Sequence, residues 1–136
     1  MQDCIFCKII RGEIPSAKVY EDEKTLAFLD IKPVNIGHVL VIPKEHFINI
    51  YDTPEETMTY LIKAAKNVSI ALKKSLQADG INVTMNNEEA SGQMIFHSHI
   101  HIIPRFKDDG FGPWHGKRDY TEGEIGEVAK KIISML

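Results

Sequence analysis

The hydrophobic positions of this 136-residue chain change their spacing along its length. Strand-like segments lie at 18–21, 25–30 and 38–43, the third of them rich in Val and Ile, and the polar turn 22–24 marks a hairpin between the first two. A helical spacing follows from residue 53 to Gly80, and two further strand-like segments come after it, at 81–86 and 95–104. The pattern predicts antiparallel strands interrupted by one long helix.

The long helix has a clear predicted start. Thr53 suits the N-cap, Pro54 suits the first helical position, and Glu56 would complete a capping box. Such a cap stabilises a helix by about 1 kcal/mol. The residues predicted to form its buried face are Met58, Leu61, Ile62, Ala65, Val68, Leu72 and Leu76.

Two shorter helical segments flank this central part. Residues 4–10 predict a short helical turn, and a last helix is predicted from Thr121, with Glu124 completing a second capping box. The fold class is therefore α+β, an antiparallel sheet of about five strands with one long helix and a C-terminal helix. We expect the domain at residues 3–106, with the loop and helix of 107–136 packed on the same domain. The loop around Trp114-His115 is interpreted as a surface connection, with a lid or a partner contact as the alternatives.

Composition and charge narrow the class of partner. The chain is 43% hydrophobic and 26% charged, which is typical of a globular protein. A net charge of -3 gives no positive field to attract nucleic acid or an acidic membrane. The first residues lack the basic run of a secretory signal peptide, and the clean apolar run 39–42 is far short of the ~20 residues that span a bilayer. We expect a cytoplasmic protein with neither kind of partner.

Three of the chain's six histidines fall within five residues, at His97, His99 and His101. On a strand, all three imidazoles would face the same side, roughly 7 Å apart. One interpretation is a solvent-facing strand, and a second is a metal site, because histidines at i and i+2 are a common ligand pair. The third is covalent catalysis, because a neutral imidazole can accept a phosphoryl group directly.

The segment 92–103, GQMIFHSHIHII, resembles the signature of the histidine triad family, in which apolar residues follow three alternating histidines. Segments 4–15, 27–33 and 37–44 resemble further family segments in the same order, so the resemblance covers about residues 3–106. It implies the family's α+β fold and a homodimer. Two positions depart from the family pattern: Ser98 replaces an apolar residue, and Met94 replaces a hydroxyl residue found in many relatives.

The resemblance implies a catalytic role for four residues. His99 would attack the α-phosphorus and form a nucleotidyl-histidine intermediate, which water then hydrolyses. His101 would contact the phosphate and help to position the leaving group, and His38 would lie behind it in a hydrogen-bonded relay. Gln93 would hold a phosphate oxygen.

The nucleotide-binding residues follow from the same resemblance. Asn86 would hold phosphate oxygens, and the carboxylate of Asp30 would accept both ribose hydroxyls. The base would lie among four apolar side chains, those of Phe6, Ile9, Phe28 and Ile31. Each of these residues also has a simpler interpretation as core, turn or loop structure.

The implied activity is that of a hydrolase acting on P–N or phosphoanhydride bonds, with a purine nucleoside phosphoramidase favoured and an AMP-type substrate. A dinucleoside polyphosphate hydrolase and a nucleotide-binding module with little turnover are the alternatives. A further alternative is a metal-dependent enzyme that uses His97, His99 and His101 on one ion.

Cys4 and Cys7 form a CxxC pair. A redox disulfide would normally follow a strand, and disulfides are disfavoured in the cytosol. A zinc site needs two more ligands. Some family members and related uridylyltransferases carry a structural zinc, and that resemblance implies Cys4, Cys7, His46 and His97 as its ligands. The alternative is two small buried cysteines beside an unrelated histidine.

Overall fold

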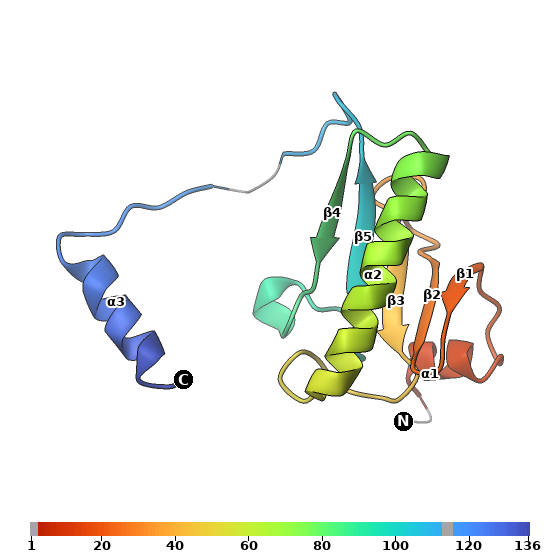
Figure 1. Cartoon of the computed structure of the whole chain (residues 1–136), viewed down its shortest axis with the longest axis horizontal. Coiled ribbons are helices and arrows are strands. Elements are labelled where there is room, and N and C mark those ends of the chain that lie inside the picture. Colours follow the sequence, from red (N-terminus) through yellow and green to blue (C-terminus); the bar gives the residue numbers. More distant parts are fainter. Residues whose placement is uncertain (1–2, 113–115) are drawn as a thin grey trace.

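The computed structural model describes residues 3–112 and 116–136, so Trp114 and His115 lie outside the described residues. One five-stranded antiparallel sheet in the order β1-β2-β3-β5-β4 forms the body of the chain (Figure 1). The elements are α1 (Ile5–Ile10), β1 (Lys18–Glu21), β2 (Thr25–Leu29), β3 (Val39–Pro43), α2 (Glu55–Ser75), β4 (Gly80–Thr84), a 3₁₀ turn at Glu89–Ser91, β5 (Ile100–Arg105) and α3 (Glu124–Ile133). The predicted α+β class is confirmed.

Helices cover both faces of the central strands. The face of α2 formed by Leu61, Ala65 and Val68 packs against one side of β2, β3 and β5. Phe6 and Ile9 of α1 pack against the other side. Because strand side chains alternate between faces, β3 is buried along its whole length. His101 pairs with Leu40, which faces α1, and therefore lies on the α1 side of the sheet.

Both ends of α2 differ from the prediction. Pro54 is the N-cap and no side chain caps the helix. The Thr53 hydroxyl instead bonds the carbonyl of Asn49 and the hydroxyl of Ser98, and Glu56 pairs with Lys24. The capping box was wrong because these tertiary partners compete for both side chains. The helix ends at Ser75, and Gly80 begins β4.

The predicted buried face of α2 is largely confirmed. Leu61, Ala65, Val68 and Leu72 are buried, and Ala64 joins them. Ile62 is 55% exposed, because it lies at the border of the helical face that meets the sheet.

The strand that carries the histidines is shorter than predicted. It begins at Ile100, so His97 and His99 precede the strand and only His101 lies on it. The Ser98 N–H donates to the carbonyl of Phe47, which ties this segment to the loop before α2 instead of to β3. The segment therefore does not join the ladder, and residues 95–97 form a bend before β5.

The C-terminal helix lies apart from the sheet in Figure 1. None of its residues is buried, and Ile125, Ile132 and Ile133 are all more than half exposed. α3 therefore buries no residue against the sheet in the single chain, whereas residues 107–111 are hydrogen-bonded to the domain through Asp79 and Arg105. Part of the second capping box is present, since the Glu124 carboxylate accepts the Thr121 N–H at 3.0 Å. In the part of the chain that is described, we find no helix with the length and apolar character needed to span a bilayer.

Candidate active site and metal centre

A cavity of about 360 Å³ opens on the α1 side of the sheet. Its walls come from α1, the end of β2 with the turn that follows, and the segment before β5. Of the predicted site residues, the cavity brings together Phe6, Ile9, Phe28, Asp30, Ile31, Asn86, His99 and His101.

His99 is buried, and one ring nitrogen is fixed. Its Nδ1 lies 2.6 Å from the carbonyl oxygen of His97, which only accepts, so the proton of the neutral ring lies on Nδ1. Nε2 then carries the lone pair and has no hydrogen-bond partner among the described residues. Burial lowers the pKa of His99 below its usual 6.5, which keeps the ring neutral at pH 7.

His38 and His101 form a hydrogen-bonded pair behind His99. The Val34 N–H donates to Nδ1 of His38 at 3.1 Å, so neutral His38 carries its proton on Nε2. That proton donates to Nδ1 of His101 at 2.9 Å, which leaves the proton of His101 on its own Nε2. Burial lowers the pKa of His101 from 6.5 to about 4. The His38–His101 pair, called the relay below, therefore has an N–H donor on Nε2 of His101. Beside it, Nε2 of His99 carries a lone pair.

The apolar wall of the cavity comes from two elements. Phe6 of α1 and Phe28 of β2 meet edge to face, with ring centroids 5.6 Å apart. Phe6 also lies edge-on to His99 at 5.4 Å. Ile31 is 90% exposed at the rim, beside Asp30. This wall suits a flat aromatic group such as a nucleobase, with a carboxylate at its edge.

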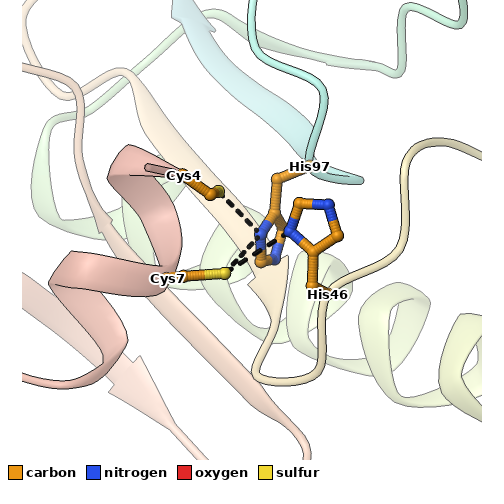
Figure 2. A group of neighbouring side chains, drawn as sticks. All are labelled: Cys4, Cys7, His46 and His97. Atoms are coloured by element: carbon orange, nitrogen blue, oxygen red, sulfur yellow. Dashed lines mark hydrogen bonds between the residues drawn. The ribbon is translucent and has the colours of Figure 1, made fainter. Parts of the chain in front are cut away.

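The side chain of His97 belongs to a second group of residues, formed with Cys4, Cys7 and His46 (Figure 2). Nδ1 of His97 is 3.4 Å from Sγ of Cys4 and 3.6 Å from Sγ of Cys7, and Nδ1 of His46 is 3.4 Å from Sγ of Cys7. These four ligand atoms all lie within 4.8 Å of one another. Cys4 is the N-cap of α1, Cys7 lies in α1, and His46 comes from the loop after β3.

The donor chemistry of this cluster fits zinc. Two sulfurs and two imidazole nitrogens are a common tetrahedral set. His97 is fully buried, and its Nε2 lies 2.9 Å from the carbonyl oxygen of Pro43, so Nε2 holds the proton and Nδ1 keeps its lone pair for a metal. Burial and the nearby Cys4 raise the pKa of the Cys7 thiol, so a cation is what would stabilise thiolates here. Bound there, the metal would supply structure, because four protein ligands close its coordination.

The three histidines of the triad do not converge on one point. His97 faces the cysteines, His99 faces the cavity, and His101 pairs with His38. The interpretations as a three-histidine ion site and as a solvent-facing strand are therefore wrong for this arrangement.

Comparison with known proteins agrees with this geometry. Residues 11–108 match the HIT domain family. The chain belongs to the HIT domain family. It is 46% identical over 138 residues to Protein hit of Bacillus subtilis, which covers 99% of this chain and 95% of that protein. A crystal structure of a HIT family member from the same species superposes with a TM-score of 0.92 at 44% identity, covering 98% of this chain and 97% of that one.

Three further relatives bear on chemistry. Adenylylsulfatase HINT3 of Arabidopsis thaliana is 46% identical over 107 residues, which are 79% of this chain and 54% of that protein. A zinc-bound histidine triad family protein from Mycobacterium smegmatis superposes with a TM-score of 0.78 at 36% identity, over 98% and 95% of the two chains. A histidine triad nucleotide-binding protein from Candida albicans superposes with a TM-score of 0.87 at 34% identity, covering 98% of this chain and 96% of that one. The HIT family thus includes nucleotide-binding proteins and hydrolases.

Gln93 differs from the expectation within this HIT site. Its side chain is 2% exposed and lies outside the cavity lining. The amide oxygen accepts the Glu88 N–H at 2.7 Å, and the amide nitrogen donates to the carbonyls of Ile48 at 2.6 Å and Ile95 at 3.1 Å. Gln93 thus organises the loop before the triad and has no free group for phosphate in this conformation.

Several cavity residues carry no sequence signal that would have identified them. Pro15 and Ser16 approach from the loop after α1, and Lys32 follows the apolar rim. These three line the cavity only because the loops around β2 and the triad fold over the same side of the sheet. Met94, which the sequence already marked as a departure from the family pattern, is 87% exposed and also lines the cavity.

Proposed function

We propose that this HIT protein is a nucleotide hydrolase or transferase that cleaves at the α-phosphate through a nucleotidyl-histidine intermediate, with purine nucleoside phosphoramidates as substrates. The observation that supports it is the fixed tautomer of His99, whose unpartnered Nε2 belongs to a cavity also lined by Asp30 and His101. A neutral imidazole is a nucleophile at pH 7.

The reaction has two steps in this proposal. First, the Nε2 lone pair of His99 bonds to the α-phosphorus and the P–N bond breaks, while Nε2–H of His101 supplies the proton that the leaving nitrogen needs. Water then attacks the phosphorus and returns a proton to Nε2 of His101, the P–Nε2 bond breaks, and AMP leaves. His38 keeps its own proton and donates it in a 2.9 Å hydrogen bond to Nδ1 of His101, which keeps Nε2 of His101 as the nitrogen that gives and regains the proton.

Binding is assigned to the surrounding groups. The base lies against Phe6, Ile9, Phe28 and Ile31, and the carboxylate of Asp30 accepts the ribose hydroxyls. Asn86 donates to the phosphate. We no longer assign that role to Gln93, since loop backbone groups occupy its amide.

We also infer one structural zinc held by Cys4, Cys7, His46 and His97. It supports folding and takes no part in the chemistry, because the four side chains leave no open position.

We further infer a cytoplasmic homodimer. Cys4 and Cys7 are proposed to bind zinc together with two histidines, and such thiol ligands suit a reducing compartment. The apolar face of α3, exposed in the single chain, would be covered in a dimer. Light scattering during gel filtration should give twice the chain mass, and a monomer at all concentrations would contradict the dimer.

The test of the activity is release of AMP from adenosine 5′-phosphoramidate by the wild type and by His99→Ala, at matched zinc content. Loss of a covalent nucleophile typically lowers kcat by about 10³-fold or more, while AMP binding should survive. Equal activity of both proteins would refute His99 as the nucleophile. If neither turns over but both bind AMP, the phosphoramidate assignment fails, and dinucleoside polyphosphates and a binding module are the remaining functions.

A further inference from the structure

The turn between β2 and β3, residues 30–38, carries Asp30, which lines the cavity, and His38, which pairs with the cavity residue His101. Its two ends are joined by a hydrogen bond from the Asp30 N–H to the His38 carbonyl, at 2.9 Å. Within it, the His38 N–H donates to the carbonyl of Asn35 at 3.0 Å. The position of the His38 ring therefore depends on how the tip of this turn is held.

Apolar packing does little to hold that tip. Val34 and Ile36 are 45% and 79% exposed. Gly37 has φ +99°, and a Cβ there would clash with Leu76. The turn thus approaches α2 closely at one point, where it has no side chain of its own.

One side chain ties the tip to β5. Nδ2 of Asn35 donates both to the carbonyl of Pro104, at 2.9 Å, and to Oδ2 of Asp109, at 3.0 Å. Pro104 belongs to the strand that also carries His101. Asn35 therefore fixes the position of the His38 turn relative to the strand of His101.

Asp109 is itself firmly held. Arg105 donates to it through Nε at 2.8 Å and Nη2 at 2.9 Å, and the N–H groups of Phe106 and Phe111 donate to it as well. The side chain of Asp109 is only 9% exposed. Arg105 also donates to Asn82 of β4 at 2.7 Å, so the acceptor that Asn35 uses is part of the sheet's end.

We propose that Asn35, anchored by Asp109, is a positioning residue for the His38–His101 relay. It keeps Nε2–H of His38 on Nδ1 of His101 and so imposes the Nε2–H tautomer of His101. The part of the inference that concerns catalysis rests on the proposed function, whereas the part that concerns the tautomer rests on the contacts alone.

The test compares Asn35→Ala and Asp109→Asn with Asp108→Asn. The last is a matched control, because Asp108 is exposed and lies next to Asp109 without being part of the Asn35 contacts. The measurements are kcat and KM for adenosine 5′-phosphoramidate, thermal unfolding, and the long-range ¹H–¹⁵N spectrum of the imidazoles. That spectrum reports which ring nitrogen holds each proton.

Asn35→Ala should lower kcat by about 10- to 100-fold, as loss of a supporting hydrogen bond does in other sites, with KM within about twofold. The ¹⁵N signals of His38 and His101 should shift toward averaged tautomers. Asp109→Asn should act in the same direction but less, since it leaves the bond to Pro104, and Asp108→Asn should match the wild type.

The proposal is overturned if Asn35→Ala keeps the wild-type imidazole signals and kcat. A lower unfolding temperature with both readouts unchanged also overturns it, because Asn35 would then only stabilise the turn. If the wild type does not turn over the substrate, the proposed function fails, and the imidazole spectra of the three variants still decide the positioning role. Should Asn35→Ala not fold, Asp109→Asn decides by the same two readouts.

Discussion

The Nδ1–H of His99 donates to the carbonyl oxygen of His97, 2.6 Å away, while the imidazole of His97 faces Cys4 and Cys7. One short stretch of backbone therefore serves two sites. The main chain of His97 sets the tautomer of His99, the proposed nucleophile, and its side chain belongs to the cluster proposed to bind zinc. Helix α1 links the same two sites again, because it carries Cys7 and also Phe6, which lines the cavity.

This double link predicts that metal removal weakens nucleotide binding. Without zinc, Cys4 and Cys7 no longer attach α1 to His46 and His97, so Phe6 is less well held against the cavity. AMP affinity should therefore fall by about 5- to 50-fold, a usual range for coupled sites. Calorimetry on zinc-loaded and chelator-treated protein measures this change. Linkage requires the reverse effect as well, so AMP should slow the release of zinc to a chromogenic chelator.

The same coupling should appear in Cys7→Ala without chelator. Its unfolding temperature should fall, because structural zinc contributes several kcal/mol to folding. Identical AMP affinity in the zinc-loaded and zinc-free proteins would show that the two sites are independent.

Ile31 is predicted to bind the base without stabilising the fold. Because its side chain is 90% exposed at the cavity rim, Ile31→Ala should raise KM by roughly three- to tenfold, the loss of an apolar contact of about 1 kcal/mol, and leave the unfolding temperature unchanged. Ile36→Ala is the matched control, since it removes the same group from the same turn outside the cavity lining. A parallel change in both variants would count against a base contact at Ile31.

Substituting Gln93 should lower stability, whereas substituting Asn86 should weaken substrate binding. Gln93→Ala leaves three partly buried backbone groups without this partner, so the free energy of unfolding should fall by about 1–3 kcal/mol. Asn86→Ala should raise KM and change stability little, because its side chain lines the cavity. Denaturant unfolding and steady-state kinetics on both variants check this, and a stable Gln93→Ala protein with a raised KM would restore its direct role in phosphate binding.

The stability of the fold should decline in mild acid. Burial holds the pKa of His101 at about 4 in the folded chain, against 6.5 for an ordinary histidine. Between these values the unfolded chain binds the additional proton, so stability is complete above pH 6.5 and falls as the pH drops toward 4. Unfolding temperatures measured from pH 7.5 to 4 should show this slope, and His101→Asn should reduce it. An unchanged slope in that variant would place the acid-sensitive group elsewhere.

The sequence by itself determined the order of the elements and most of the site. The spacing of apolar residues predicted five strands and the long helix, because a linear pattern of residue types is enough to reveal such elements. The resemblance of the triad and its flanking segments to a known family implied which residues line the cavity.

Only the tertiary structure decided which hydrogen-bond partner each site residue has, and therefore which ring nitrogen of each histidine carries the proton. The tautomer of His99 depends on the carbonyl of His97, that of His38 on the N–H of Val34, and the free lone pair of His97 on the carbonyl of Pro43. The Gln93 amide and the Thr53 hydroxyl likewise went to partners remote in sequence, up to 45 residues away. Hydrogen bonds of this kind form between groups that the chain brings together only on folding, and therefore residue spacing alone does not predict them.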